Sequence, residues 1–203
     1  MNQSTKPPGK ASLDGCRACD LWARASQAVP GEGPTKATVM LVGEQPGDAE
    51  DVAGRPFVGP AGQLLRGVMK EVGMTPGTVY ITNAVKHFSW EPRGKRRIHK
   101  TPVQREITAC EQWLDAEIAA VRPRVIVALG AVALRALLPG KMTVSGARGS
   151  TLPHPSGARL IATFHPSAAL RAPDAARRNE IVAALGEDLR RALREATASP
   201  MPD

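Results

Sequence analysis

Four short apolar runs alternate with longer stretches of helical periodicity along the chain. The runs span 38–42, 78–82, 125–129 and 160–164 and consist mainly of apolar and β-branched residues. Runs of this length that end at glycine or polar residues indicate buried strands. Between and after them, apolar positions recur at helical spacing over 64–72, 107–118, 131–138 and 181–193. This alternation calls for an α/β protein with a parallel sheet and helices on both faces.

The length of 203 residues fits a single domain. We expect a flexible N-terminal tail over the polar residues 1–14, one domain over 15–197 and a C-terminal tail over 198–203. Inside the domain, 16–28 is interpreted as a short helical stretch, and 139–157, rich in Gly, Ser and Pro, as a long loop. No apolar run approaches 18 residues and the N-terminus lacks the apolar region of a secretion signal, so the sequence predicts a cytoplasmic protein without a membrane partner.

The chain carries a strong positive charge, because 27 Lys and Arg outnumber 19 Asp and Glu and leave a formal charge of +8. Such a balance favours an anionic partner, nucleic acid first, although the charge can also serve solubility alone. Three Phe, three Trp and one Tyr are too few for a surface of stacked aromatics that follows a single strand. Three cysteines argue against a disulfide framework.

Unusual polar segments follow three of the predicted strands: 43–51 after the first, 83–87 and then 94–100 after the second, and 165–167 after the fourth. Ligands of open α/β sheets bind outside the carboxyl ends of the strands. We therefore expect the three segments to converge on one cleft.

The first segment combines two glycines with polar side chains. Gly43 and Gly47 let a ligand approach the backbone closely, and Glu44, Gln45 and Asp48 offer groups that could contact a flat polar ring. A tight turn with helix-capping acids is the alternative interpretation. The segment lacks the GxxxxGK[ST] pattern, which disfavours a nucleoside-triphosphate site.

Two further side chains suit a nucleobase. Phe57 lies in a Pro/Gly-rich loop, where it can either stack on a base or fill the core below the loop. Asn83 can offer a donor and an acceptor to a pyrimidine edge, or can simply end a strand.

A basic cluster follows the expected cleft. Lys95, Arg96, Arg97 and Lys100 can contact phosphates, although such a run is often just a solvated loop. His99 lies within it, where the cationic setting lowers the pKa of the imidazole and favours its neutral, nucleophilic form. A phosphate hydrogen-bond donor is the alternative role.

The cysteines suggest a metal site. Cys16 and Cys19 form a CxxC pair, Cys110 lies in a predicted helix, and His87 is the candidate fourth ligand. An iron–sulfur cluster and a structural zinc ion fit these residues equally well, and inert buried thiols remain an alternative.

Together these motifs resemble the uracil-DNA glycosylase superfamily. The likeness is carried by Gly43-Glu44-Gln45-Pro46-Gly47, Thr82-Asn83-Ala84-Val85-Lys86 and His165-Pro166-Ser167. The CxxC pair and Cys110 resemble the iron–sulfur branch of that superfamily, the family 4 type. Lys95-Arg96-Arg97-Ile98-His99 matches in full the loop motif of the UdgX group, whose member becomes covalently attached to DNA. The resemblance extends over about 16–193.

This resemblance implies a three-layer α/β/α sandwich with a four-stranded parallel sheet, a [4Fe–4S] cluster, and recognition of uracil in DNA, preferably single-stranded. Ordinary family 4 enzymes have cysteine where this chain has His87, so Cys₄ ligation is excluded here. The likeness to the UdgX group makes His87 the fourth ligand and favours iron–sulfur over zinc. We expect a monomer without an obligate protein partner.

The resemblance also assigns roles to residues. Phe57 is expected to stack on a flipped uracil and Asn83 to bind its edge, while His165 stabilises the leaving uracil anion. His99 is expected to attack C1′ of the sugar, helped by Glu44 and Asp48, and Arg97 is expected to hold the loop and a phosphate in place. The full expected sets are His99, Glu44, Asp48 and His165 for catalysis, Gly43, Gln45, Phe57 and Asn83 for uracil binding, Lys95, Arg96, Arg97, Lys100 and Ser167 for DNA binding, and Cys16, Cys19, His87 and Cys110 for the cluster. A turnover glycosylase and a non-enzymatic iron–sulfur DNA binder are the alternatives.

Overall fold

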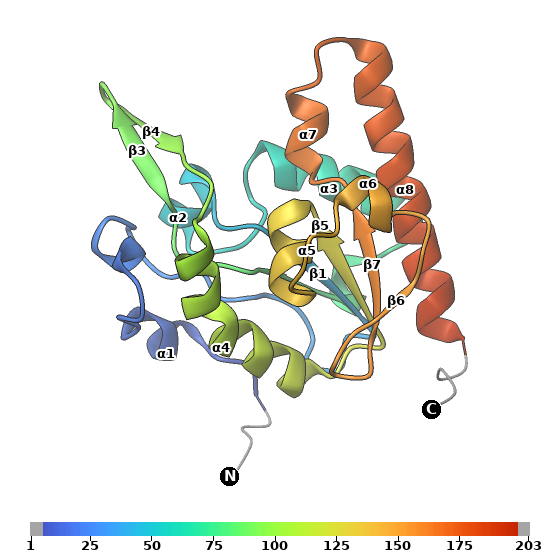
Figure 1. The fold of residues 1–203 in the computed structure, drawn as a ribbon, viewed down its shortest axis with the longest axis horizontal. Coiled ribbons are helices and arrows are strands. Elements are labelled where there is room, and N and C mark those ends of the chain that lie inside the picture. Colours follow the sequence, from blue (N-terminus) through green and yellow to red (C-terminus); the bar gives the residue numbers. More distant parts are fainter. Residues whose placement is uncertain (1–5, 199–203) are drawn as a thin grey trace.

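The computed structural model describes residues 6–198, and the four expected strands form the centre of the fold (Figure 1). They are β1 (Val39–Gly43), β2 (Val79–Asn83), β5 (Val125–Leu129) and β7 (Arg159–Thr163), parallel and in the order β2-β1-β5-β7. A fifth strand, β6 (Leu152–Pro153), pairs antiparallel with β7. The sheet is therefore mixed and five-stranded, which corrects the expected four-stranded parallel sheet.

The added strand arises inside the stretch expected as a long loop. Residues 139–157 contain α6 (Val144–Ala147) as well as β6. β6 lies at the edge of the sheet, where Pro153, which has no N–H to donate, is tolerated. Tertiary pairing with β7, which no local pattern reveals, gives this segment its structure.

Helices cover both faces of the sheet, as the pattern predicts. α4 (Gln104–Val121), α5 (Ala131–Leu137) and α6 pack on one face, and α3 (Pro60–Glu71) and α8 (Ala175–Thr197) on the other. Successive side chains of a strand point to opposite faces. Met40 and Val42 accordingly lie in the first core, and Val39 and Leu41 in the second. The result is a three-layer α/β/α arrangement.

Two short helices follow strands at their carboxyl ends. α2 (Asp48–Ala53) comes after β1, and α7 (Pro166–Leu170) comes directly after β7. A 3₁₀ turn, η2 (Pro76–Thr78), leads into β2. The connections after β1, β2 and β7 thus lie at one end of the sheet.

The N-terminal segment is more structured than expected. α1 (Lys10–Asp14) lies within the stretch expected as a tail, and Leu13 is fully buried. The helical stretch expected over 16–28 contains only the 3₁₀ helix η1 (Asp20–Ala23). Residues 1–5 and 199–203, the outer parts of the two expected tails, lie outside the described residues.

The basic cluster forms a β-hairpin instead of a loop. β3 (Trp90–Arg93) pairs antiparallel with β4 (Arg96–His99), with Trp90 opposite His99. Gly94 takes a φ of 60° in the connecting turn, a conformation that glycine adopts without strain. The hairpin projects from the body of the molecule (Figure 1).

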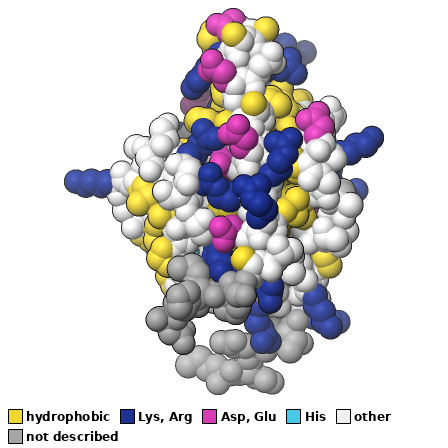
Figure 2. All heavy atoms as spheres, turned by 90° about the vertical axis from the view of Figure 1, so that its right-hand side faces the viewer, with side chains coloured by type: hydrophobic (Ala, Val, Ile, Leu, Met, Phe, Trp, Pro, Cys, Tyr) yellow, Lys and Arg dark blue, Asp and Glu magenta, His cyan; other side chains and the backbone are white. Residues whose placement is uncertain are grey.

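The side of the molecule that carries α8 shows mixed charge. Lys and Arg side chains stand beside Asp and Glu there (Figure 2). Arg148 pairs with Asp188, and Arg159 with Glu195. These two arginines are therefore neutralised locally. Across residues 6–198, none of the helices combines the length and the apolar character that a membrane crossing requires.

Candidate active site

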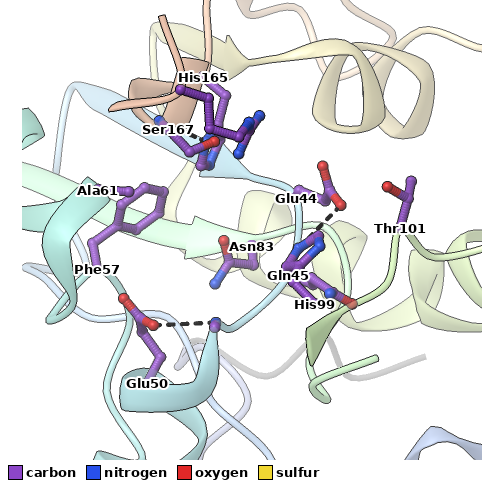
Figure 3. A pocket seen from close by; sticks show the side chains of 12 residues that line it. Glu44, Gln45, Glu50, Phe57, Ala61, Asn83, His99, Thr101, His165 and Ser167 are labelled. Atoms are coloured by element: carbon purple, nitrogen blue, oxygen red, sulfur yellow. Dashed lines mark hydrogen bonds and ion pairs between the residues drawn. The ribbon is translucent and has the colours of Figure 1, made fainter. Parts of the chain in front are cut away.

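A cavity of about 450 Å³ opens at the carboxyl ends of the strands (Figure 3). The structure brings together there residues from all three polar segments and from the hairpin. The lining residues are Glu44, Gln45, Gly47, Glu50, Phe57, Ala61, Asn83, His99, Thr101, His165, Ser167 and Arg171.

Gly43 allows the inner wall of the cavity to form. A Cβ atom at this position would lie 2.4 Å from Asn83 Oδ1 and 2.5 Å from Phe57 Cζ, so only glycine lets both side chains approach the end of β1. Asn83 is 3% and Phe57 5% exposed. The amide of Asn83 and the ring of Phe57 form adjacent parts of this wall (Figure 3).

Phe57 is both a core residue and a cavity residue. It packs in the α3–α8 core, and its ring centroid lies 6.1 Å from that of His165. Its φ of 55° is in the left-handed region, which is unfavourable for a bulky side chain. Gly62 permits this conformation, because a Cβ atom there would lie 1.9 Å from the Phe57 carbonyl oxygen. The two roles expected for Phe57, stacking on a base and filling the core, are therefore compatible.

His165 presents a neutral imidazole to the cavity. Its Nδ1 accepts from the backbone N–H of Ser167 at 3.2 Å and lies 2.7 Å from the Ser167 hydroxyl. Because Nδ1 accepts, the proton of the neutral ring is on Nε2. Burial, with help from Arg171 and His99, lowers the pKa of His165 to about 4. The ring can therefore donate a hydrogen bond without carrying a charge at neutral pH.

Glu44 and His99 face each other across the mouth of the cavity. His99 Nε2 lies 3.4 Å from Glu44 Oε1, an oxygen that is buried and has no hydrogen-bond partner. Burial raises the pKa of Glu44 and lowers the pKa of His99, and Arg171 lowers the latter further. Each pKa shift favours the uncharged form of its side chain. His99 is therefore neutral at pH 7 and keeps a lone pair available.

Gln45 holds the base of the hairpin instead of pointing its amide at a ligand. Its Nε2 donates to the carbonyls of Ser89 at 3.0 Å and Lys100 at 3.1 Å, and its Oε1 accepts from the Ser89 N–H at 3.0 Å. The side chain therefore joins the two ends of the hairpin directly beside Glu44. Any contact of this residue with a ligand falls to its backbone.

Asp48 and Arg97 are used to attach the hairpin to α2. Asp48 is exposed, does not line the cavity, and its Oδ1 lies 2.6 Å from Arg97 Nε. Arg97 also pairs with the fully buried Asp51, which accepts two further bonds from the Ser26 N–H, both at 3.0 Å. The structure thus separates Asp48 from Glu44 and commits the Arg97 guanidinium to carboxylates.

The other basic residues of the hairpin are free to meet solvent. Lys95, Arg96 and Lys100 are exposed. Lys95 and Arg96 lie at the turn of the hairpin, and Lys100 directly follows His99 at its base. Ser167 lies inside the cavity, where its hydroxyl contacts His165.

Four lining residues, Glu50, Ala61, Thr101 and Arg171, were missed from sequence. Glu50 accepts from the N–H groups of Gly47 at 3.1 Å and Gly59 at 2.8 Å, so it ties α2 to the start of α3. Its place three residues after Gly47 is the spacing of a helix-capping acid and could have identified it. Arg171 and Thr101 carry no such signal, because only the fold brings them to the cavity.

The three cysteines lie near one another, and the place of His87 as their fourth partner stays a prediction. The thiols of Cys16 and Cys19 contribute to a raised pKa of Cys110, about 11, whose main cause is burial. Trp113 Nε1 donates to Cys16 Sγ at 3.2 Å. His87 lines a pocket of about 220 Å³ to which no cysteine contributes. Among residues 6–198 no three His, Cys, Asp or Glu side chains have the spacing of a metal site.

Three thiols supplied by a loop and by α4 nevertheless fit an iron–sulfur cluster chemically. Thiolate is the ligand that such clusters take, and N–H donation to sulfur is a usual feature of their surroundings. A buried thiol with a raised pKa is inert by itself but is held as thiolate by a metal. The donor set therefore fits for Cys16, Cys19 and Cys110.

Comparison with known proteins shows clear relatives. The family description "Uracil DNA glycosylase superfamily" matches residues 30–190. A type-4 uracil-DNA glycosylase of Thermotoga maritima is 40% identical over 178 residues, 87% of this chain and 87% of the relative. A type-4 enzyme of Pyrobaculum aerophilum is 40% identical over 172 residues, 79% and 82% of the two chains. A type-5 enzyme of the same organism is 32% identical over 175 residues, 78% and 74%.

The type-4 relatives also bear on the cofactor. They represent the iron–sulfur class to which the cysteine pattern pointed, and they support a [4Fe–4S] cluster as the cofactor of this chain. The match of the family description over most of the chain agrees with the three-layer fold and with the cavity at the strand ends. This chain belongs to the uracil-DNA glycosylase superfamily.

Proposed function

We propose that this protein excises uracil from DNA, preferably single-stranded, and that His99 then forms a covalent bond with C1′ of the abasic deoxyribose. The observation that carries the proposal is the neutral His99 imidazole, held 3.4 Å from the Glu44 carboxylate at the mouth of the cavity. The proposed substrate, uracil in DNA, is taken from the relatives' names, because the type-4 and type-5 enzymes are both described as uracil-DNA glycosylases.

The inner wall suits a flipped uracil. Phe57 offers a flat face, and the Asn83 amide offers a donor and an acceptor to the polar edge of the base. Backbone groups around Gln45 supply further contacts. Gly43 keeps this wall thin enough for the base to reach both side chains.

Bond cleavage leaves a negative charge on uracil and a positive charge on the sugar. The electron pair of the N1–C1′ bond departs with the base, and the anion is stabilised by the Nε2–H of His165. Because the pKa of His165 is about 4, its ring donates this hydrogen bond in the neutral form. The sugar is left with oxocarbenium character at C1′.

Capture follows when the lone pair of His99 Nε2 forms a bond with C1′. The imidazole becomes a cation, which Glu44 faces and stabilises. The exposed imidazolium then gives its remaining N–H proton to solvent. The neutral N-alkylated imidazole is a poor leaving group, so the adduct persists and each protein molecule acts once. Asp48 and Arg97 support this step by holding the hairpin, since neither lines the cavity.

The remaining assignments concern DNA and cofactor. In this proposal the exposed Lys95, Arg96 and Lys100 contact DNA phosphates, and Ser167 contacts the DNA inside the cavity. Cys16, Cys19 and Cys110, with His87 as the proposed fourth ligand, would hold the [4Fe–4S] cluster. The cluster supplies a structural cross-link between the N-terminal segment and α4, apart from the cavity. The protein acts as a cytoplasmic monomer.

A denaturing gel combined with a uracil-release assay tests the proposal. Purified holoprotein is incubated with a single-stranded oligonucleotide that contains one uracil, and with the same oligonucleotide containing thymine. We expect a band of reduced mobility and stoichiometric free uracil with the first substrate only. Multiple turnovers of uracil release without the shifted band would instead establish a turnover glycosylase. Absence of both, with the oligonucleotide still bound in a gel under native conditions, would overturn the proposal in favour of a DNA binder.

A further inference from the structure

A fully buried ion pair lies next to the cavity, and neither of its members takes part in the reaction described above. Lys86 and Glu117 are both 0% exposed, and Lys86 Nζ lies 2.7 Å from Glu117 Oε2. Removing two charges from water is costly, and apolar residues of similar volume often fill such positions at no loss of stability. The pair therefore calls for an explanation beyond packing.

Every polar atom of the pair is engaged. The Lys86 ammonium donates to Glu117, to Thr82 Oγ1 at 2.8 Å and to the Asn83 carbonyl at 2.7 Å, which uses all three of its protons. Glu117 Oε2 also accepts from the Thr82 hydroxyl at 2.7 Å, and its Oε1 accepts from the Gly31 N–H at 3.0 Å. The end of β2 is thus held by charge-assisted bonds.

The segment held in this way carries the base-binding wall. Asn83 is the last residue of β2, and its carbonyl is fixed by Lys86 while its amide faces the cavity. The next two residues continue the attachment: the Ala84 N–H donates to the Gly43 carbonyl at 2.9 Å and the Val85 N–H to the Glu44 carbonyl at 3.0 Å. Residues 83–86 therefore connect the pair to both Asn83 and Glu44.

Little displacement of Asn83 can be tolerated. Its Oδ1 lies so close to the end of β1 that a single methyl group on Gly43 would overlap it. Hydrogen bonds to a base edge lose strength steeply with distance and angle. A shift of the Asn83 backbone would therefore be passed directly to its contact with the base.

We propose that Glu117, acting through Lys86, is the positioning residue for Asn83 and so determines how well the cavity recognises uracil. The proposal rests on uracil excision but not on covalent capture by His99. Glu117 touches neither base nor sugar. It acts from α4 by fixing the Lys86 ammonium, which in turn fixes the Asn83 carbonyl.

The decisive variant is the double substitution Lys86→Met/Glu117→Leu, which removes both charges and keeps an apolar side chain of similar volume at each position. Because no buried charge is left unpaired, we expect it to fold. Single-turnover uracil release is measured against protein concentration. We expect the half-saturating concentration to rise at least about tenfold, with a smaller change in the maximal rate, and discrimination of uracil from cytosine to fall.

A matched control separates positioning from stability. Arg159→Met/Glu195→Leu removes an ion pair at the opposite end of the sheet, where Arg159 begins β7. We expect this control to alter the melting temperature at most and to leave half-saturation and base discrimination unchanged. Uracil release by the unsubstituted protein tests the proposed function itself, so failure of that function is distinguished from failure of this proposal.

The proposal is overturned if the Lys86→Met/Glu117→Leu variant folds and binds and discriminates uracil like the unsubstituted protein. If that variant does not fold, Glu117→Asp decides, because it keeps Lys86 paired but shortens the carboxylate arm by one methylene. A raised half-saturating concentration in folded Glu117→Asp supports positioning. Unchanged kinetics with a lowered melting temperature would mean that the pair is structural only.

Discussion

The two sides of the cavity are attached to the molecule in different ways. Asn83, Phe57 and His165 form the inner side. Asn83 and Phe57 are buried and closely approach Gly43, and the Ser167 N–H and hydroxyl hold the His165 ring. His99 forms the outer side. It is 48% exposed and is the last residue of β4, at the base of the projecting hairpin that side chains hold in place. A rigid recognition site and a separately attached arm can be altered independently. We therefore expect uracil excision and covalent capture to be separable.

The largest expected effect comes from His99→Ser, which removes the nucleophile of the outer side. Covalent adduct should be abolished, while uracil release continues, because bond cleavage depends on the inner side. The smaller side chain leaves room for water at C1′, and Glu44 can orient it. A denaturing gel and a uracil-release assay measure the two outcomes.

His154→Ser is the matched control for this substitution, since His154 lies in the turn between β6 and β7. Persistence of the adduct in His99→Ser would place the nucleophile elsewhere. Loss of both adduct and uracil release would show that the two sides cannot be separated.

Gly43→Ala should damage both activities together. The added methyl group would overlap Asn83 Oδ1 and the Phe57 ring, and displacement of these groups by about 1 Å can cost about 10²-fold in rate. Single-turnover rates of uracil release and of adduct formation measure the loss. Gly67→Ala on α3 is the control, because a Cβ atom there meets nothing within 4 Å. If Gly43→Ala reduced capture alone, the inner side would not be the recognition site.

Acid should suppress capture before it suppresses cleavage. The pKa of His99 is lowered from 6.5, so the imidazole is neutral above that pKa and becomes protonated, and non-nucleophilic, as the pH falls below it. The pKa of His165 is about 4, so its ring stays neutral over this range. The ratio of adduct to released uracil should therefore fall about tenfold per pH unit below the His99 pKa.

A pH series of quenched single-turnover reactions measures this ratio. The rate of uracil release by His99→Ser should lack this dependence on the His99 pKa, because the variant has no imidazole at that position. A constant ratio between pH 4 and 8 would contradict a neutral His99 nucleophile.

Gln45→Ala should loosen the hairpin without disturbing base recognition. The substitution removes the three hydrogen bonds that join Ser89, Lys100 and the end of β1. We expect adduct formation to slow by about tenfold and uracil release to change less, because only His99 loses its fixed position. Gln112→Ala, at an exposed position of α4, is the control. Equal loss of both rates would show that Gln45 also binds the base.

The smallest effect concerns salt. Each phosphate contact adds about 1 to the slope of log binding constant against log salt concentration. Lys95→Ala/Arg96→Ala should therefore reduce that slope by about 2 for single-stranded uracil DNA, with little change in the rate at saturating protein. Lys36 precedes β1 at the other end of the sheet, so the control substitution Lys36→Ala should leave the slope unchanged. An unaltered slope in the first variant would remove the hairpin from the DNA interface.

The sheet and its covering helices were predictable because their signal is local. Val125–Leu129 is uniformly apolar, and the face of α8 that carries Leu185 and Leu189 repeats at helical spacing. The hairpin carries no such signal. Its strands are polar, and the residues that hold it from the body, Gln45 and Asp51, lie far from it in sequence. For the same reason the sequence suggested Gln45 and Asp48 as ligand-binding or catalytic groups, whereas their side chains support the hairpin.

Side-chain identity predicted chemistry better than it predicted partners. The glycine at 43 and the amide at 83 suggested close approach to a flat polar ring. The amide lines the cavity, whereas Gly43 does not and instead makes room for Asn83 and Phe57. Arg97 was expected to hold the loop and a phosphate. It holds the hairpin through Asp48 and Asp51, partners that charge alone cannot distinguish from a phosphate. The joining of His87 to the cysteines stays a prediction.

The ends of the hairpin meet at a single backbone hydrogen bond, from the Lys100 N–H to the Ser89 carbonyl at 3.0 Å. Residues 90–99 therefore leave and re-enter the body at one place, and none of the sheet strands depends on them for pairing. Such an element can be gained or lost in evolution through a small insertion or deletion in the gene, without redesign of the core. An ancestral enzyme that releases its product and a descendant that retains it could thus be separated by one short genetic event.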